Sequence, residues 1–177
     1  FDLRPSTLIW AEGADKSKGK SRYELYPADE LVIYTTPASP SDLRAVLEVV
    51  KPKIVHVLAV SPAKEKTDEF LARLAGMAKF AINNKGGKVS VNELAVATAQ
   101  RVNAARIGLE WLAAGGHVAM TGEEDALFLS AGNGNANQYL QKELYTVVRG
   151  ILEETAAYRA YFSRAGVEAL MEHLAQK

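Results

Sequence analysis

The stretch that decides the fold is "LVIYTTPASPSDLRAVLEVVKPKIVHVLAV", residues 31–60. Its ends, 31–36 and 54–60, are runs of β-branched and aliphatic residues, which favour strands. Nearly continuous apolar strands that are joined through a helix are typical of a parallel sheet covered on both faces. The stretch therefore predicts a small parallel βαβ unit, a Rossmann-like half. The upstream segments "STLIWAEG" and "RYELYPADE" are candidates to add an edge strand.

The middle of this stretch carries the signals of a helix start. Ser39 precedes Pro40, and Asp42 follows three residues after Ser39. This spacing predicts a capping box with proline at the first helical position. The helix is expected to end around Pro52. Its apolar residues share one face, which we expect to be buried: Leu43, Val46, Leu47 and Val50.

The period of the sequence becomes helical in residues 65–135. "KTDEFLARLAGMAKFAIN" predicts one helix, and a second begins at the capping box that Ser90 forms with Glu93. A third helix runs from about Asn103 to Ala114 and ends at two glycines. "HVAMTGEEDALFLS" then predicts two strands around a turn at 122–125. Three helices followed by a hairpin are typical of a winged helix-turn-helix.

The remaining residues, 136–177, read as a C-terminal helical segment. A sustained apolar stripe predicts one long helix, with a break at 163–166 before a last helix. The stripe consists of Leu140, Leu144, Val147, Val148, Ile151, Leu152, Tyr158 and Tyr161. We expect a mixed α/β chain with three domains: a βαβ unit over 1–64, a winged helix over 65–135, and helices that pack across both over 136–177.

The composition limits the classes of function. The 21 basic residues balance 21 acidic residues, so no overall field attracts nucleic acid or membrane, and any electrostatic binding must be local. The absence of cysteine is compatible with a cytoplasmic location, which we expect, and no apolar run predicts a membrane partner. The chain begins at Phe1 rather than Met, and we expect it to be part of a longer protein.

No grouping of residues predicts catalysis within this chain. The three histidines, His56, His117 and His173, fall in different elements without a carboxylate or second histidine at metal-ligand spacing. "GNGNAN" at 132–137 lacks the third glycine of a dinucleotide fingerprint, and "NNKGGKV" at 83–89 lacks the first glycine and the hydroxyl of a phosphate loop. We therefore expect no catalytic residue, metal or cofactor here.

The third helix of the predicted winged helix has an unusual surface. Its core face is expected to hold Ala105, Gly108, Leu109 and Leu112. A second apolar stripe of Ala104, Ile107 and Trp111 lies where a helix that reads DNA would carry polar residues. Acidic residues at 123–125 would also repel phosphates. This stripe predicts a protein interface, and two alternatives stay open: packing within this chain, or contact with an external partner.

Two groups of residues are candidates to bind nucleic acid. The linker-like stretch 14–22 contains Lys16, Lys18, Lys20 and Arg22, which is either a solvated loop or a contact to the phosphates of a single strand. The second group belongs to the third helix and consists of Arg101, Asn103 and Arg106.

Four stretches carry a resemblance to a known family: residues 30–60, "FLARLAGMAKFAINNKGGKVSVNELAVATAQ", "ARIGLEWLAAGGHV" and "LEETAAYRAYF". Taken in order, they resemble the C-terminal region of bacterial RecJ-type exonucleases. The resemblance implies a 5′ to 3′ exonuclease of the DHH phosphoesterase superfamily, specific for single strands and active in recombination and repair. Its Mn or Mg site would belong to an N-terminal catalytic core, so no catalytic residue carries over.

The resemblance implies a non-catalytic accessory region. Its expected partners are the catalytic core of the same protein, a repair protein and single-stranded DNA. The alternative is a stand-alone winged-helix transcription regulator that binds duplex DNA, and a third possibility is a purely structural domain.

Overall fold

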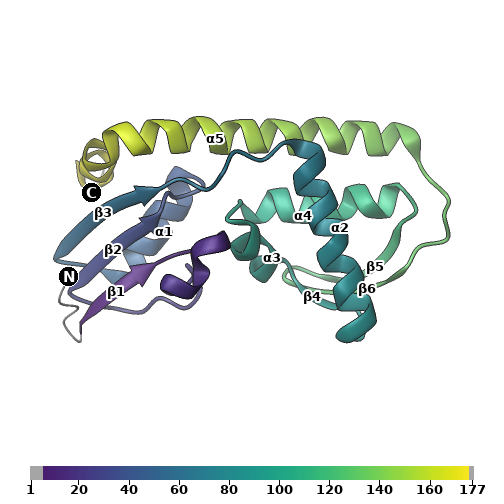
Figure 1. The fold of residues 1–177 in the computed structure, drawn as a ribbon, viewed down its shortest axis with the longest axis horizontal. Coiled ribbons are helices and arrows are strands. Elements are labelled where there is room, and N and C mark those ends of the chain that lie inside the picture. Colours follow the sequence, from purple (N-terminus) through teal and green to yellow (C-terminus); the bar gives the residue numbers. More distant parts are fainter. Residues whose placement is uncertain (1–5, 176–177) are drawn as a thin grey trace. The chain divides into compact units, whose positions relative to one another are not determined.

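The computed structural model describes residues 6–175, with side chains described as far as Glu172. Its contacts divide the chain into two compact units. Unit 1 contains the described residues up to Ala63 and those from Thr155 onward, and unit 2 is Lys64–Glu154. Each unit has its own sheet and its own core (Figure 1). The mixed α/β class predicted from the sequence is confirmed, with a three-stranded parallel sheet in unit 1.

The sheet of unit 1 consists of β1 (Thr7–Trp10), β2 (Glu30–Thr35) and β3 (Ile54–Val60), in the order β1-β2-β3. Both neighbouring pairs are parallel; the sequence predicts a parallel arrangement for the two apolar runs, which form β2 and β3. The upstream segment "STLIW" supplies β1 at one edge, whereas "RYELYPADE" contains no strand before Glu30. Between β1 and β2 lies a short 3-10 helix, η1 (Gly13–Lys18).

Helix α1 (Pro40–Val50) begins where the capping signal predicts. The Ser39 hydroxyl accepts a hydrogen bond from the Asp42 backbone N–H at 3.1 Å, and Pro40 occupies the first helical position. The four predicted core residues of α1 are all buried. They pack with Leu31 and Ile33 of β2 and with Phe162 from the C-terminal part of the chain.

The predicted apolar strand at 54–60 forms β3, but only one face of β3 is covered within unit 1. Val55 and Val57 pack against the core, but the alternate positions do not, since Ile54 is 50% exposed and Leu58 is 58% exposed. In Figure 1, α1 lies behind the strands, and no helix of unit 1 lies in front of β3. The apolar character of β3 is therefore not explained by burial within unit 1.

Unit 2 packs α2 (Thr67–Asn84), α3 (Val91–Thr98) and α4 (Val102–Ala114) around an apolar core. The predicted core face of α4 is buried as expected. Gly108 allows α4 to approach α2 closely, because a Cβ at that position would lie 2.3 Å from the Leu74 side chain.

The antiparallel sheet of unit 2 contains β4 (Lys88–Ser90), β5 (Val118–Glu123) and β6 (Ala126–Ala131), in the order β4-β6-β5. The two long strands match the predicted hairpin. The short β4 was not predicted, because its residues follow a stretch that signals a helix stop. Gly87 lies just before β4 with φ +80°, and a Cβ there would lie 1.9 Å from the Leu129 carbonyl oxygen, so this approach requires glycine.

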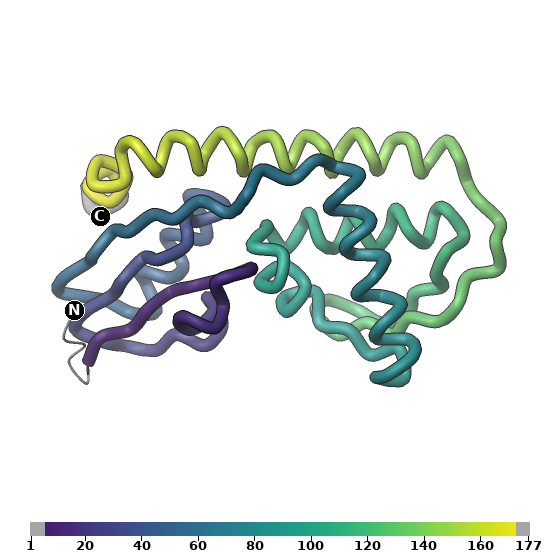
Figure 2. The backbone as a smooth tube through the Cα atoms, viewed as in Figure 1, coloured from purple at the N-terminus to yellow at the C-terminus, as the bar shows by residue number. Residues whose placement is uncertain are grey.

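The C-terminal helix α5 (Gln138–Ala175) contributes residues to both units. Figure 2 follows it from green to yellow. Its backbone departs from helical geometry at Ala165, with φ −132° and ψ 33°, inside the predicted break. The predicted apolar stripe is buried at Val148, Ile151 and Leu152 but not at every position. No helix in the described part of the chain combines the length and apolar character needed to cross a membrane.

Candidate functional site

Helix α4 of unit 2 borders two cavities. The first, which we term the apolar groove, has a volume of about 580 Å³ and lies between α2, α4 and the β5-β6 hairpin. Apolar side chains dominate its lining, and four polar residues also contribute: Asp68, Lys79, Asn83 and His117. The apolar lining consists of Leu71, Ala72, Ala75, Ile82, Trp111, Leu112, Val118 and Ala131.

The sequence of α2 explains why a groove remains here. Its lining residues recur at spacings of three and four, which places them on one helical face. Leu71 is buried in the core and forms part of the floor, whereas Ala72 and Ala75 have side chains too small to fill the space above it. An apolar concave surface that remains open to solvent is typical of a binding site.

The second cavity, which we term the polar cavity, has a volume of about 510 Å³ and lies between α4 and the first turns of α5. It is lined by Trp111, Gln138, Gln141, Lys142, Tyr145, Thr146 and Arg149. This lining contains two aromatic rings, two cations and no carboxylate. All seven residues belong to unit 2.

Trp111 lines both cavities. Its ring is partly buried against the core of unit 2, and its centroid lies 6.3 Å from that of the His117 ring. Ile107 is also partly buried against this core. Ala104 is fully buried in it, so the predicted interface role does not hold for Ala104, which is a core residue.

The N-terminal half of α5 is fixed alongside α4 (Figure 1). Arg101, just before α4, forms an ion pair with Glu154 at 3.0 Å. The Tyr145 hydroxyl donates a hydrogen bond to the Asp68 carboxylate at 2.9 Å, and this bond raises the pKa of Tyr145 above its ordinary value. Val148, Ile151 and Leu152 add apolar contacts to the core. The first turns of α5 are therefore held along the Trp111 side of α4, with the polar cavity between them.

The three residues predicted to contact nucleic acid at the start of α4 do not form a basic surface. Arg101 is paired with Glu154, and the Arg106 guanidinium donates to the backbone carbonyl of Glu124 at the turn between β5 and β6. Asn103 is exposed. Both Glu123 and Glu124 are exposed beside this turn. A duplex that approached this end of α4 would meet acidic side chains.

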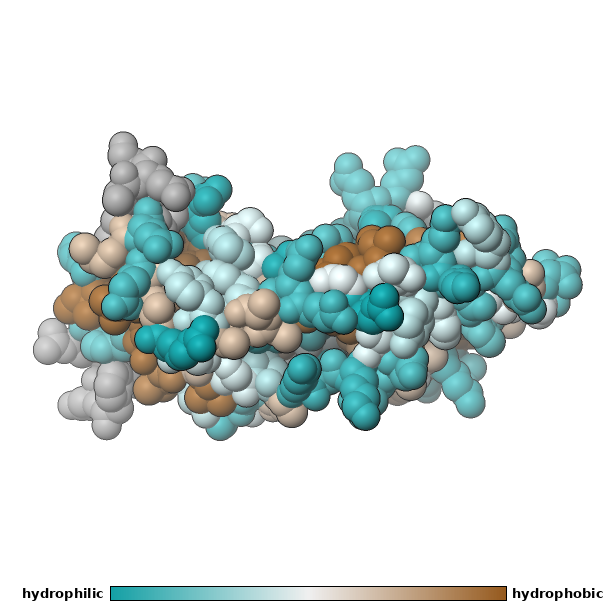
Figure 3. All heavy atoms as spheres, turned by 90° about the horizontal axis from the view of Figure 1, so that it is seen from above, coloured by the Kyte–Doolittle hydropathy of each residue, from teal (hydrophilic) through white to brown (hydrophobic). Residues whose placement is uncertain are grey.

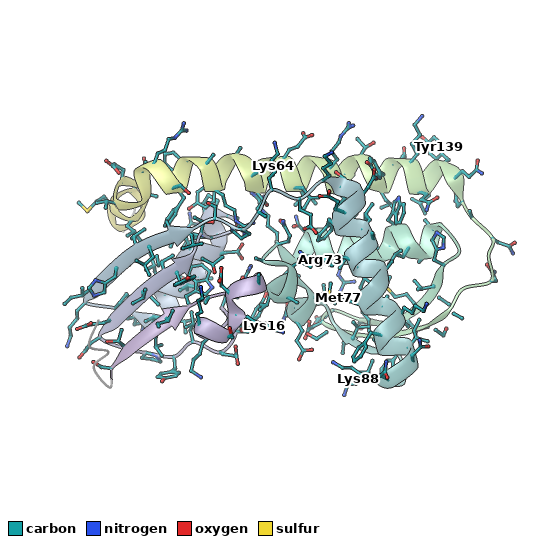
Figure 4. All side chains as sticks on the ribbon, viewed as in Figure 1. Lys16, Lys64, Arg73, Met77, Lys88 and Tyr139 are labelled. Atoms are coloured by element: carbon teal, nitrogen blue, oxygen red, sulfur yellow. The ribbon has the colours of Figure 1, made fainter. Side chains whose placement is uncertain are left out.

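The basic residues of the loop around η1 divide into two groups. Lys16, Lys18 and Lys20 are exposed, and Figure 4 shows Lys16 on η1. Lys18 pairs with Asp15 at 3.0 Å and lies 4.6 Å from the centre of the Tyr34 ring. The side chain of Lys20 lies 5.9 Å from the centre of the Tyr26 ring.

Arg22 is the buried member of this group, with its side chain only 5% exposed. Its guanidinium pairs with Glu12 at 2.5 Å and with Asp42 at 2.8 Å. Burial alone would lower the pKa of Arg22, but the hydrogen bonds to Glu12 and the charges of both carboxylates raise it. Arg22 therefore holds the loop to α1, and the three lysines are the members of this group that face solvent.

The residues of α5 that line the polar cavity were missed from the sequence. The apolar stripe predicts the helix but gives no information on the polar positions beside it. A signal was present, because Gln138, Gln141, Lys142, Tyr145, Thr146 and Arg149 recur at helical spacing and include no acidic residue.

Among the described side chains, no three His, Asp or Glu groups lie close enough together to hold a metal ion. Comparisons of the whole chain with protein-family models, with curated proteins and with solved structures found no match.

Proposed function

We propose that this chain is a non-catalytic accessory region of a RecJ-like exonuclease specific for single strands, and that unit 2 docks a protein partner in the apolar groove. The observation that carries the docking role is the environment of α4. Helix α5 runs along its Trp111 side across the polar cavity, and an apolar groove opens between α4 and α2. A helix flanked by other helices in this way is suited to contact protein rather than the major groove of a duplex.

The open face of β3 supports a second protein contact. Ile54, Leu58 and Val60 are 50%, 58% and 40% exposed, and parallel sheets are normally covered on both faces. We propose that the catalytic core of the same protein covers this face. The exposed lysines of the η1 loop would contribute weak contacts to the phosphates of a single strand, where charge rather than base sequence determines binding.

The proposal that this chain is part of a RecJ-like exonuclease is tested by the coding sequence upstream of Phe1. A DHH-type catalytic core in the same reading frame would support the proposal, and an unrelated upstream protein, or none, would refute it. In the supporting case the core would bind Mn or Mg, in the cytoplasm, for recombination and repair.

Docking in the apolar groove is tested by a pair of substitutions on adjacent residues of α2. Ala75→Glu places a charge in the groove, whereas Gly76→Glu places the same charge where a Cβ meets nothing within 4 Å. We expect the whole protein, isolated from its host, to retain one partner in the wild type and in Gly76→Glu and to lose it in Ala75→Glu. Equal retention in all three proteins would refute docking in the groove.

The topology of unit 2 favours a second candidate function. The order α2-β4-α3-α4-β5-β6, with β6 between β4 and β5, is compatible with a winged helix, and Asn103 is exposed at the start of α4. A stand-alone transcription regulator would bind duplex DNA with sequence preference and with a steep dependence on salt. A duplex-binding assay across salt concentrations separates the two candidates, because the accessory region is expected to show neither.

A further inference from the structure

The polar cavity contains a combination of side chains that neither docking in the apolar groove nor the packing of unit 2 explains. The part of α5 that belongs to unit 2 packs on the core through one apolar face, on which Val148 is fully buried and Ile151 and Leu152 are nearly so. The adjacent stripe of the same helix is polar and meets the indole of Trp111 across an open cavity. A tryptophan in a core contact is ordinarily met by apolar side chains, so the cavity is not simply unfinished packing.

The charges of the cavity favour an anion. Lys142 and Arg149 both line it and are seven positions apart, which corresponds to two helical turns or about 10 Å along α5. Arg149 contacts Glu153 at a distance of 3.9 Å, with both side chains more than half exposed. An exposed pair of this kind contributes little stability and leaves the guanidinium able to bind a ligand.

The remaining lining residues favour a planar ring with polar edges. Trp111 and Tyr145 offer aromatic surfaces on which a base can stack. The amides of Gln138 and Gln141 can donate and accept hydrogen bonds at the edges of a base. Figure 3 views unit 2 from the side of α5, where mostly hydrophilic residues surround a smaller hydrophobic patch.

We propose that the polar cavity binds a nucleotide, with the base stacked on Trp111 and the phosphate bound by Lys142 or Arg149. This proposal deepens the single-strand contact of the proposed function and assigns it a second location, separate from the η1 loop. The same chemistry is present in a free mononucleotide and in one nucleotide of a single strand.

The two tryptophans of the chain allow a direct test. Trp10 belongs to unit 1 and is 1% exposed, so the Trp10→Phe protein leaves Trp111 as its single indole. Thymidine monophosphate, thymidine, inorganic phosphate and an oligothymidylate are each titrated against the fluorescence of this protein. We expect thymidine monophosphate to quench it in a saturable way, and thymidine or phosphate alone to bind about ten-fold more weakly or worse.

Exposed cations supply variants that are expected to fold normally. At least one of Lys142→Gln and Arg149→Gln should weaken nucleotide binding about three- to ten-fold, because it removes the charged hydrogen-bond donor to the phosphate. Lys79→Gln is the matched control, since Lys79 is also exposed but lines the apolar groove. Absence of quenching by thymidine monophosphate would overturn the proposal, as would thymidine binding of equal strength or equal affinities of the three variants.

The outcomes also identify the source of the ligand and separate the two proposals. Tighter binding of the oligothymidylate by more than about ten-fold would assign the cavity to a single strand, and equal binding would assign it to a mononucleotide; either result supports the site. Ala75 does not line the polar cavity, so the two proposals fail in different ways. Equal partner retention in Ala75→Glu with saturable quenching by thymidine monophosphate would refute docking alone, and loss of the partner without any quenching would refute the nucleotide site alone.

Discussion

The two units of this chain place their polar groups differently. Unit 1 encloses charged side chains, since Glu12 is 3% exposed and the side chain of Arg22 is 5% exposed. The core of unit 2 is formed by apolar residues, and the charged side chains that border its cavities at Lys79, Lys142 and Arg149 are exposed. Unit 1 therefore depends on buried ion pairs for part of its stability, whereas unit 2 depends mainly on the close packing of apolar side chains. These three cations of unit 2 therefore face solvent and can contact a ligand.

Each unit contains one tryptophan, so the two can be followed separately. Trp10 reports on unit 1 in a Trp111→Phe protein, and Trp111 reports on unit 2 in a Trp10→Phe protein. The unfolding of each unit in urea can be measured through the fluorescence of its own tryptophan.

The largest effect is expected from a cavity in the core of unit 2. Phe70 is fully buried, so Phe70→Ala should lower the free energy of unfolding of unit 2 by about 3–5 kcal/mol. Phe80 lies on the same helix and is 56% exposed. Phe80→Ala should therefore have a much smaller effect. Similar losses for the two substitutions would contradict the view that close packing of the core stabilises unit 2.

A somewhat smaller effect is expected from breaking the buried ion pairs of unit 1. Arg22→Leu leaves the Glu12 carboxylate buried without its cation, which should lower the free energy of unfolding of unit 1 by about 3 kcal/mol. A second substitution, Glu12→Gln, should restore part of this loss, because it removes the uncompensated charge.

The control is an exposed ion pair in the same unit. Lys53 and Asp29 are 2.9 Å apart, with side chains 76% and 58% exposed. Lys53→Leu should leave the unfolding midpoint of unit 1 unchanged. If Lys53→Leu and Arg22→Leu had equal effects, burial would not be what makes the Arg22 pairs important.

A third effect, of about 1 kcal/mol, is expected at the start of α3 in unit 2. The Asp125 carboxylate accepts hydrogen bonds from the Ser90 hydroxyl at 2.8 Å and from the Asn92 backbone N–H at 2.7 Å. Asp125→Ala removes both bonds and should destabilise unit 2 by this amount. Glu124→Ala changes an exposed neighbour in the same turn and should leave its stability unaltered; a larger loss there would contradict the capping role of Asp125.

These residues show what the sequence could reveal about the fold. The start of α1 at Ser39 and the buried face of α4 were predicted correctly, because a cap and a helical face depend on residues only three or four apart. The capping box at Ser90 was only half correct. The hydroxyl accepts from the Glu93 N–H as expected, but its second partner is Asp125, which lies 35 residues away.

The elements that were missed depend on distant partners. Strand β4 has three residues and exists through pairing with β6, about forty residues later, so its own sequence carries little signal. In the sequence, Arg22 resembles the other cations of the basic loop. Its burial depends on ion pairs with carboxylates of two other segments, Glu12 and Asp42. Trp111 could be singled out because a large apolar residue at an outward position is visible locally. The polar cavity could not be predicted, since periodicity does not determine which face of α5 meets α4.

The smallest effect is expected in alkaline solution and concerns the core of unit 1. Burial, with a contribution from the neighbouring Tyr161, raises the pKa of Tyr158 to about 12. Because the folded pKa lies above the ordinary value, the contribution of Tyr158 is complete below about pH 10 and is lost as the pH rises through 12. Unit 1 should therefore lose stability over this interval. Tyr158→Phe should remove part of that dependence, because phenylalanine cannot ionise.

Tyr139 supplies the control for this last comparison. It is 75% exposed at the start of α5 (Figure 4), so Tyr139→Phe should leave the alkaline dependence of both units unchanged. The measurement is the unfolding midpoint of each unit in urea between pH 9 and pH 12, with Trp10 or Trp111 as the probe. If Tyr158→Phe and the wild type lost stability in parallel over this range, ionisation of Tyr158 would not be the cause.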